Sequence, residues 1–233
     1  MTTVAIIGNP NVGKTELFNR LTGMKQHVGN WPGVTVEKKT GKLVHRGEEI
    51  EVVDLPGTYS LAATAKDELV SRSYILEERP DVVVDIVDAT SLERNLYLTL
   101  LLLELEANLV VALNRWDMAR ERGIVIDTEK LSELLGVPVV PTVAPSGEGV
   151  ERLKDAVLEA AKAEGGKRKI VVGYGEEAEI AIAEVEDAVR KDAELSRRYP
   201  PRWLAIRLLE DDEHVLKLIE TSPHQRTIRA AVR

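Results

Sequence analysis

A glycine-rich stretch near the N-terminus is the part of the sequence best suited to binding phosphates. It reads GNPNVGKT and matches G-x-x-x-x-G-K-[ST], between the apolar run Val4–Ile7 and helical spacing over Thr15–Leu21. Backbone N–H groups in such a loop point toward phosphate oxygens beside a positive helix N-terminus. Lys14 would supply charge to the β- and γ-phosphates, and the Thr15 hydroxyl would bind Mg²⁺. The predicted phosphate-binding residues are Gly8, Asn9, Pro10, Asn11, Val12, Gly13, Lys14 and Thr15.

A second motif, DLPG, follows the apolar run Ile50–Val53 about 40 residues later. An aspartate at the end of such a strand can reach the water shell of Mg²⁺, and the glycine offers an unobstructed N–H to a γ-phosphate. D-x-x-G is common by chance, so the motif is significant here because it follows a predicted strand. The predicted residues are Asp54, Leu55, Pro56 and Gly57.

A third motif, NRWD, comes directly after the apolar run Leu109–Leu113. The carboxylate of Asp117 could accept hydrogen bonds from N1–H and the exocyclic amine of guanine, which adenine lacks at those positions. The alternative is that Asp117 is a helix N-cap. The three motifs together, each after a strand, predict a guanine-nucleotide site.

The stretch GNWPGVTVE, residues 29–37, lies between the first two motifs. A GTPase needs a hydroxyl and a backbone N–H there to close over Mg²⁺ and the γ-phosphate, which makes Thr35 a candidate ligand. Trp31 is either a packing anchor or an exposed contact for a partner, and we favour the exposed contact. The predicted first switch consists of Gly33, Val34, Thr35, Val36 and Glu37.

Strand and helix patterns alternate through the first two thirds of the chain. Runs such as Val82–Val87 are typical of buried parallel strands, whereas Val36–Val44 and Ile50–Val53 indicate an antiparallel pair. The sequence predicts an α/β fold of the P-loop GTPase type, with a mainly parallel sheet, one antiparallel edge strand and helices on both faces. Asp85 interrupts its run, and we interpret it as a hydrogen-bonded polar group near a sheet edge or interface rather than a catalytic one.

A small all-α domain is predicted after the α/β domain. Gly165 and Gly166 interrupt the pattern, so we place the domains at residues 1–165 and 166–233. Apolar residues at helical spacing from Ala178 to Val189 predict one helix beyond this boundary, and Trp203–Leu209 and Val215–Ile219 predict two more.

Composition excludes several classes of protein. A net charge of -8 over 233 residues argues against a surface that coats nucleic acid, and the lack of cysteine excludes disulfides and thiolate metal sites. The four histidines have no metal-ligand spacing, so no Fe²⁺ site is expected. The first residues lack the basic region of a signal peptide, and no apolar stretch is long enough to cross a bilayer.

The motifs in their order resemble a known family. GNPNVGKT, GNWPGVTVE, DLPGTYSL, LERNLYLTL and NRWD are similar to the cytosolic G domain of FeoB, the prokaryotic ferrous iron transport protein B. PPRWLAIRLLEDDEHVL resembles the helical segment that follows it in the family, so the likeness covers essentially the whole chain. The resemblance implies a GTPase with slow intrinsic hydrolysis, and a domain at 166–233 that favours GDP binding like a dissociation inhibitor.

The resemblance also implies partners and a location. Full-length members continue into a transmembrane iron-permease region that is absent here, so this chain would be the soluble N-terminal portion of a membrane transporter at the cytoplasmic face of the inner membrane. A small accessory protein of the iron transport system and an oligomer are compatible partners, and nucleic acid is not.

Site residues follow from the same likeness. Thr15, Thr35 and, through water, Asp54 would hold Mg²⁺, while Asn11 would bind K⁺ that neutralises charge in the transition state. The alternative for Asn11 is a turn residue that tolerates unusual backbone angles. The Ala144 N–H is expected to face the guanine carbonyl oxygen. The guanine-binding set is Asn114, Arg115, Trp116, Asp117, Val143 and Ala144.

The sequence departs from the family pattern at three places. Thr58 follows DLPG, so the usual water-orienting glutamine is missing. Arg115 and Trp116 stand where methionine is common, so base stacking could differ. Thr142-Val143-Ala144 replaces the usual Ser-Ala pair of the base loop, so nucleotide release could differ too.

Two other functions remain open at this point. A nucleotide-sensing module with negligible turnover is compatible with the missing glutamine. An RNA-associated GTPase of the ribosome-assembly kind is disfavoured, because residues 168–233 hold 12 Lys/Arg and 13 Asp/Glu and form no basic stripe.

Overall fold

The chain folds into two units in a computed structural model that describes residues 1–23, 26–62, 65–163 and 170–232. Unit 1 comprises Met1–Leu103 and Ala107–Ile170, and unit 2 comprises Glu104–Glu106 and Val171–Arg233. The boundary predicted between residues 165 and 166 lies outside the described residues. Among the helices that the structure describes, none is long and apolar enough to cross a membrane.

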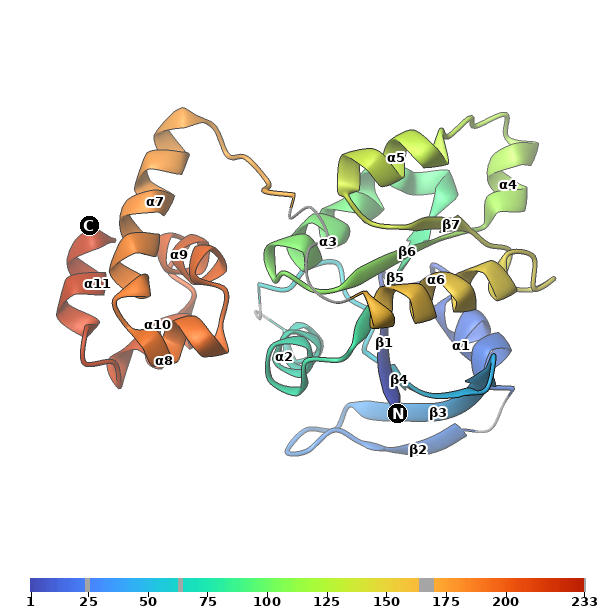
Figure 1. Ribbon diagram of the computed structural model, residues 1–233, viewed down its shortest axis with the longest axis horizontal. Coiled ribbons are helices and arrows are strands. Elements are labelled where there is room, and N and C mark those ends of the chain that lie inside the picture. The colour runs from blue at the N-terminus through green and yellow to red at the C-terminus, as the bar shows by residue number, and fades with distance from the viewer. Residues whose placement is uncertain (24–25, 63–64, 164–169, 233) are drawn as a thin grey trace. The chain divides into compact units, whose positions relative to one another are not determined.

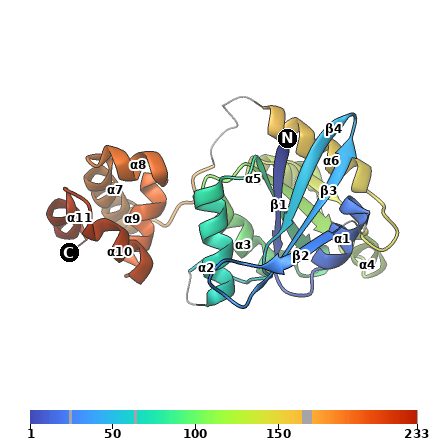
Figure 2. The same ribbon diagram turned by 90° about the horizontal axis from the view of Figure 1, so that it is seen from below.

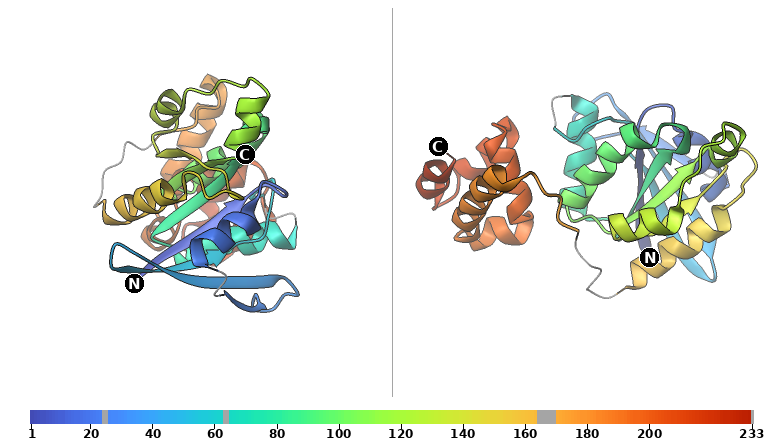
Figure 3. Two further views of the ribbon diagram at one scale, coloured as in Figure 1. Left: turned by 90° about the vertical axis from the view of Figure 1, so that its right-hand side faces the viewer. Right: turned by 90° about the horizontal axis from the view of Figure 1, so that it is seen from above.

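The described part of unit 1 is built on a seven-stranded sheet in the order β2-β3-β4-β1-β5-β6-β7 (Figure 1). The strands are β1 (Thr2–Gly8), β2 (Gln26–Asn30), β3 (Glu37–His45), β4 (Glu48–Asp54), β5 (Val82–Asp88), β6 (Leu109–Asn114) and β7 (Val139–Pro141). β3 runs antiparallel to both of its neighbours and the other pairs are parallel, which confirms the predicted sheet. The sequence did not predict β2, which extends the sheet beyond β3 as the edge strand (Figure 3).

Helices cover both faces of this sheet, as predicted. α1 (Lys14–Thr22) and α6 (Val150–Lys162) lie on one face, and α2 (Lys66–Ser73) and α3 (Leu92–Glu104) lie on the other (Figures 1 and 2). The shorter elements are a π-helical turn at Tyr74–Glu78, a 3₁₀ turn at Ala89–Ser91, α4 (Trp116–Glu121) and α5 (Thr128–Leu135).

The central strands are buried on both faces. Every residue of β5 and of β6 is buried, which is why both read as nearly continuous apolar runs in the sequence. The core on one face joins these strands to Leu17 and Phe18 of α1 and Leu153 of α6. Because β4, β1, β5 and β6 are parallel, their carboxyl ends meet at one edge, and the loops that follow them are brought together there.

Unit 2 is helical, as predicted. Its helices are α7 (Glu176–Arg190), α8 (Ala193–Arg198), α9 (Pro201–Leu209), α10 (Glu213–Glu220) and α11 (Gln225–Ala231). Val185, Trp203 and Ile219, from three of these helices, are buried. Asp192 and Asp212 cap α8 and α10 by accepting hydrogen bonds from backbone N–H groups of the first turn, which sets where each helix begins.

Asp85 is a buried carboxyl group in the middle of β5. Only 1% of the residue is exposed, and the Thr99 hydroxyl of α3 donates a hydrogen bond of 2.6 Å to its Oδ2. This confirms the hydrogen-bonded polar group, but the predicted place near a sheet edge is wrong, because β5 lies between β1 and β6 in the sheet. Burial raises its pKa from 3.8 to about 7, against the opposing effect of the Thr99 hydrogen bond.

The raised pKa makes the stability of unit 1 dependent on pH. Between about pH 4 and pH 7 the folded state binds a proton at Asp85 that the unfolded chain has released, so the free energy of unfolding falls as pH rises through this window. Asp85→Asn keeps a hydrogen-bonding group without the charge. We expect it to raise the melting temperature at pH 8 by about 10 °C, corresponding to about 4 kcal/mol, with little effect at pH 4.

Differential scanning calorimetry across pH 4–8 measures this effect. Asp187→Asn, at an exposed position of α7, is the matched control and should leave the profile unchanged. A wild-type pH dependence that persists in Asp85→Asn would contradict the assignment.

Candidate functional site

The three sequence motifs meet at the carboxyl edge of the sheet. Gly8 ends β1, Asp54 ends β4, and Asn114 ends β6. Asp54 pairs in register with Ile6, two residues before the phosphate loop, and Asn114 pairs with Asp88 at the end of β5. The structure therefore brings together the predicted phosphate, switch and base motifs.

The phosphate loop requires its glycines because other groups approach closely. A Cβ at Gly13 would lie 2.4 Å from Nδ2 of Asn114, and Gly13 has a φ of +90°. A Cβ at Gly8 would lie 2.7 Å from the carbonyl oxygen of Ile86. Asn11 also adopts a positive φ, 66°, which its short polar side chain tolerates better than most residues do. The loop between β1 and α1 therefore requires glycine at positions 8 and 13.

Lys14 and Asp54 form an ion pair at the centre of the site. The Lys14 ammonium donates to Oδ1 of Asp54, which is only 8% exposed. Burial raises the pKa of Asp54, and the Lys14 charge and hydrogen bond oppose this rise. Both groups that were predicted to handle phosphate and magnesium thus lie side by side.

The second switch packs directly against the phosphate loop. The Thr58 N–H donates to the Gly8 carbonyl at 3.1 Å, and a Cβ at Gly57 would lie 3.6 Å from the backbone of Pro10. The buried Thr58 hydroxyl donates to the Ser60 carbonyl at 2.8 Å. The side chain that stands in place of glutamine is therefore engaged within its own loop.

Asn114 connects the phosphate loop to the base loop. Its Nδ2 donates to the Val12 carbonyl at 2.8 Å, and its Oδ1 accepts from the Ala144 N–H at 3.0 Å and from the Thr142 hydroxyl at 3.3 Å. Asn114 is 1% exposed, so these bonds are formed out of water. The Ala144 N–H, expected to face guanine, would have to be shared with or released from Asn114 to do so.

Asp117 lies at the start of α4, in the region that follows β6. It lies in the first turn of α4, whose N-cap is Arg115 with a φ of 59°, so the alternative that Asp117 is the N-cap is wrong. Within the part of the chain that the structure describes, its half-buried carboxylate makes no hydrogen bond. Its acceptor oxygens are therefore available to a ligand.

Two arginines tie the base-binding segments to neighbouring elements, one to the phosphate loop and one to α1, and only one of them was in the predicted site. Arg115 donates to Oδ2 of Asp88 at 2.7 Å and to the Asn11 carbonyl at 2.5 Å. Arg20 of α1 donates from Nε to the Ala144 carbonyl at 3.1 Å, and from Nη2 to the Pro145 carbonyl. Sequence reasoning missed Arg20 and Asp88 because no motif marks them; only the place of Asp88 at the end of a strand hinted at a role.

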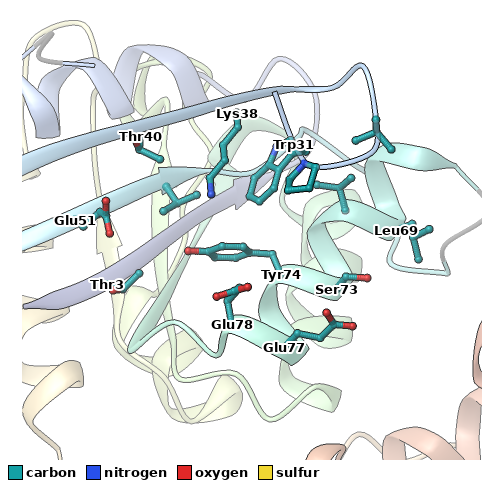
Figure 4. Close-up of a pocket in the computed structure, with 14 residues that line it drawn as sticks. Thr3, Trp31, Lys38, Thr40, Glu51, Leu69, Ser73, Tyr74, Glu77 and Glu78 are labelled. Atoms are coloured by element: carbon teal, nitrogen blue, oxygen red, sulfur yellow. The ribbon is translucent and has the colours of Figure 1, made fainter. Parts of the chain in front are cut away.

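The first switch occupies most of the turn between β2 and β3, and Trp31, which precedes it in that turn, is buried. Trp31 is 7% exposed, and its ring contacts Tyr74 edge-on at a centroid distance of 5.3 Å (Figure 4). The preference for an exposed Trp31 is therefore wrong in this conformation. Thr35 is exposed, and among the described residues its hydroxyl makes no hydrogen bond.

The donor atoms at the edge of the sheet suit hard cations. Asp54 offers a carboxylate and Thr15 an exposed hydroxyl, which are oxygen ligands of the kind that Mg²⁺ prefers. Asn9 is 3% exposed and its buried Oδ1 lacks a hydrogen-bond partner among the described residues, which leaves an oxygen for a cation or a water. In the described chain, no three His, Cys, Asp or Glu residues form a cluster that could hold a metal by themselves.

Two family models match this chain. Residues 2–157 match ferrous iron transport protein B, and residues 174–233 match the FeoB cytosolic helical domain. An Fe(2+) transporter FeoB from Methanocaldococcus jannaschii is 50% identical over 94% of this chain and 32% of its own length. A fusion of Fe(2+) transport protein A with the Fe(2+) transporter FeoB from Porphyromonas gingivalis is 42% identical over 94% of this chain and 26% of its own. The chain spans about a quarter to a third of the length of these relatives.

A solved structure supports the same relationship. The cytosolic domain of the T. maritima FeoB iron transporter in its GMPPNP form is 39% identical, covers 100% of this chain and 96% of its own, and gives a TM-score of 0.87. Both the sequence models and the fold therefore agree over unit 1 and unit 2, and the chain belongs to the FeoB family of ferrous iron transport proteins.

Proposed function

We propose that this chain binds GTP and hydrolyses it slowly, and that its nucleotide state regulates ferrous iron transport by a membrane region. The convergence of the three motifs at one edge of the sheet carries this proposal. It agrees with the fold shared with a relative described in a GMPPNP form. Iron specificity rests on the names of the relatives, since the described residues include no metal cluster.

The proposed roles follow from the geometry of the loops. Residues 8–15 surround the phosphates, Lys14 exchanges Asp54 for phosphate oxygens, and Asp117 reads guanine. Thr15, Thr35 and, through water, Asp54 hold Mg²⁺, which supplies positive charge beside the γ-phosphate when bound. Because Thr35 is exposed and its hydroxyl makes no hydrogen bond among the described residues, closure of the first switch over the nucleotide is part of this proposal.

Slow turnover is proposed from the engaged Thr58 side chain. Its hydroxyl already bonds the Ser60 carbonyl, so it is not positioned to orient a water. Asn11 is proposed to bind K⁺, since its side chain is exposed at the phosphate loop; its positive φ also fits the alternative of a turn residue. A nucleotide sensor with negligible turnover is the second candidate, because a Thr58 hydroxyl that bonds the Ser60 carbonyl also fits a site that does not hydrolyse GTP.

The proposed partners come from the longer relatives. We infer a transmembrane iron-permease region as the regulated partner, a location at the cytoplasmic face of the inner membrane, and a GDP-dissociation-inhibitor-like role for unit 2. The fusion of Fe(2+) transport protein A in one relative supports an accessory protein as a further partner. An oligomer is compatible with this arrangement. The family match favours iron transport over an RNA-associated function.

Base specificity tests the nucleotide site. We expect GTP and GDP to bind at least about 100-fold more tightly than ATP, because adenine leaves the Asp117 carboxylate without donors. Asp117→Asn should lose this preference and bind xanthosine diphosphate instead, since an amide can donate to its 2-oxo group. Isothermal titration calorimetry measures both, with Asp127→Asn, at a helix N-cap away from the motifs, as control. Equal affinity of the wild type for ATP and GTP would overturn the proposal.

Potassium dependence tests the role of Asn11. Steady-state phosphate release from GTP should be about tenfold or more faster in K⁺ than in Na⁺. Asn11→Ala should lose this stimulation and keep GDP affinity. If K⁺ still stimulates phosphate release in Asn11→Ala, Asn11 is a turn residue and not the K⁺ ligand. If the wild type shows no turnover above background in either salt, the nucleotide sensor is favoured over the GTPase.

Arg115 should slow nucleotide release by fixing the phosphate loop to β5. Arg115→Met removes both of its hydrogen bonds, and we expect GDP to dissociate about fivefold faster, equivalent to about 1 kcal/mol. Arg115→Lys keeps the charge but not the paired geometry, so its rate of GDP dissociation should lie between those of the wild type and Arg115→Met. Stopped-flow release of a fluorescent GDP measures the rate. Arg122→Met, at the exposed end of the same helix, is the control, and an unchanged rate in Arg115→Met would contradict the prediction.

A further inference from the structure

A pocket of about 570 Å³ lies in unit 1, away from the three nucleotide motifs. It is bounded by β1, β3 and β4 on one side and by α2 with its following π-helical turn on the other (Figure 4). This volume lies within the range of sites that bind small molecules or single side chains with their flanking residues. None of the site residues predicted for phosphate, magnesium or guanine lines it except Val34 of the first switch.

Two aromatic rings form one wall of the pocket. Trp31 and Tyr74 meet edge-on, and the Lys38 ammonium lies 4.6 Å from the centroid of the Trp31 ring. In the described residues, the buried Nε1 of Trp31 has no hydrogen-bond partner. The aliphatic side chains of Val53, Leu69 and others continue this surface.

The charges around the pocket favour a cation. Glu51, Glu77 and Glu78 line it together with a single lysine, Lys38. Burial raises the pKa of Tyr74 to about 12, and the charges of Glu78 and Glu51 add to this rise. The Tyr74 hydroxyl thus lies near the negative charge of two carboxylates, and the Lys38 ammonium lies 5.8 Å from the centroid of the same ring.

We propose that this pocket docks a basic segment of a protein partner, with one arginine side chain inserted between Tyr74 and the carboxylates of Glu51 and Glu78. Charge complementarity selects the occupant, because a guanidinium can stack on an aromatic ring and bond a carboxylate at the same time. The apolar stem of the arginine and its neighbours contact the Val53 and Leu69 side of the pocket.

The position of the pocket gives this docking a consequence for the first switch. Trp31, Pro32 and Val34 belong to the turn that carries Thr35, and they line the pocket. A partner bound there would hold that turn against α2. This consequence rests on the proposed nucleotide function, whereas the binding of the basic segment does not.

The test compares two peptides that differ only in charge. Acetyl-Leu-Arg-Leu-amide and its citrulline analogue are titrated into the full chain saturated with GDP, and the Trp31 indole N–H signal, assigned by its loss in Trp31→Phe, is followed by NMR. We expect the arginine peptide to shift this signal with a Kd on the order of 1 mM, and the citrulline peptide to bind at least about threefold more weakly.

Matched variants assign the charge effect to the pocket. Glu78→Gln and Glu51→Gln should each weaken the binding of the arginine peptide about threefold. Glu49→Gln is the control and should leave this affinity unchanged, because Glu49 lies on β4 with Glu51 but does not line the pocket. The proposal is overturned if both peptides bind equally, if Glu49→Gln weakens binding as much as Glu78→Gln, or if the Trp31 signal does not move. A loss of GTP specificity in the Asp117 experiments would leave this result unaffected.

Discussion

The buried amide of Asn114 is the interaction on which the rest of the site depends. It is the one side chain that bonds both the phosphate loop, through Val12, and the base loop, through Ala144 and Thr142, among the described residues. Because it is shielded from water, losing either set of bonds would leave a buried polar group unpaired. Gly13 is required because this amide occupies the space of its Cβ. Two loops far apart in the sequence thus hold each other at a fixed separation.

The charged groups around this amide form pairs that a ligand can replace. Lys14 pairs with Asp54, and Arg115 pairs with Asp88. The first pair is in the position where phosphate and a divalent cation would enter, so each charge can change its partner without being left unpaired. The second pair lies beneath the loop and holds the Asn11 carbonyl. The Lys14–Asp54 pair is therefore placed to exchange partners with a ligand, whereas the Arg115–Asp88 pair supports the phosphate loop.

Sequence patterns predicted the fold and the motifs, because burial of a strand and the need for glycine in a turn both show within a short stretch of residues. Continuous apolar runs identified β5 and β6, which are buried on both faces, and the glycine spacing of the phosphate loop identified the turn that only such residues can form. β2 could not be predicted, because its side chains are mostly exposed and it is defined by pairing with β3. The burial of Trp31 depends on Tyr74, more than forty residues away, and the role of Arg20 depends on carbonyl groups of the base loop. These contacts exist only in three dimensions.

The order of strands in the sheet has a consequence for how the chain folds during synthesis. β1 is the first strand in the sequence and lies near the middle of the sheet, where Val4 pairs with Val52 on one side and with Val82 on the other. Its apolar residues are therefore translated long before either partner strand exists. Until β4 leaves the ribosome this strand has two open edges, and one edge stays open until β5 follows, so the nascent chain is exposed to mispairing. The strand that carries the phosphate loop is thus the first to be made, and it is completed only after β4 and β5 have both been translated.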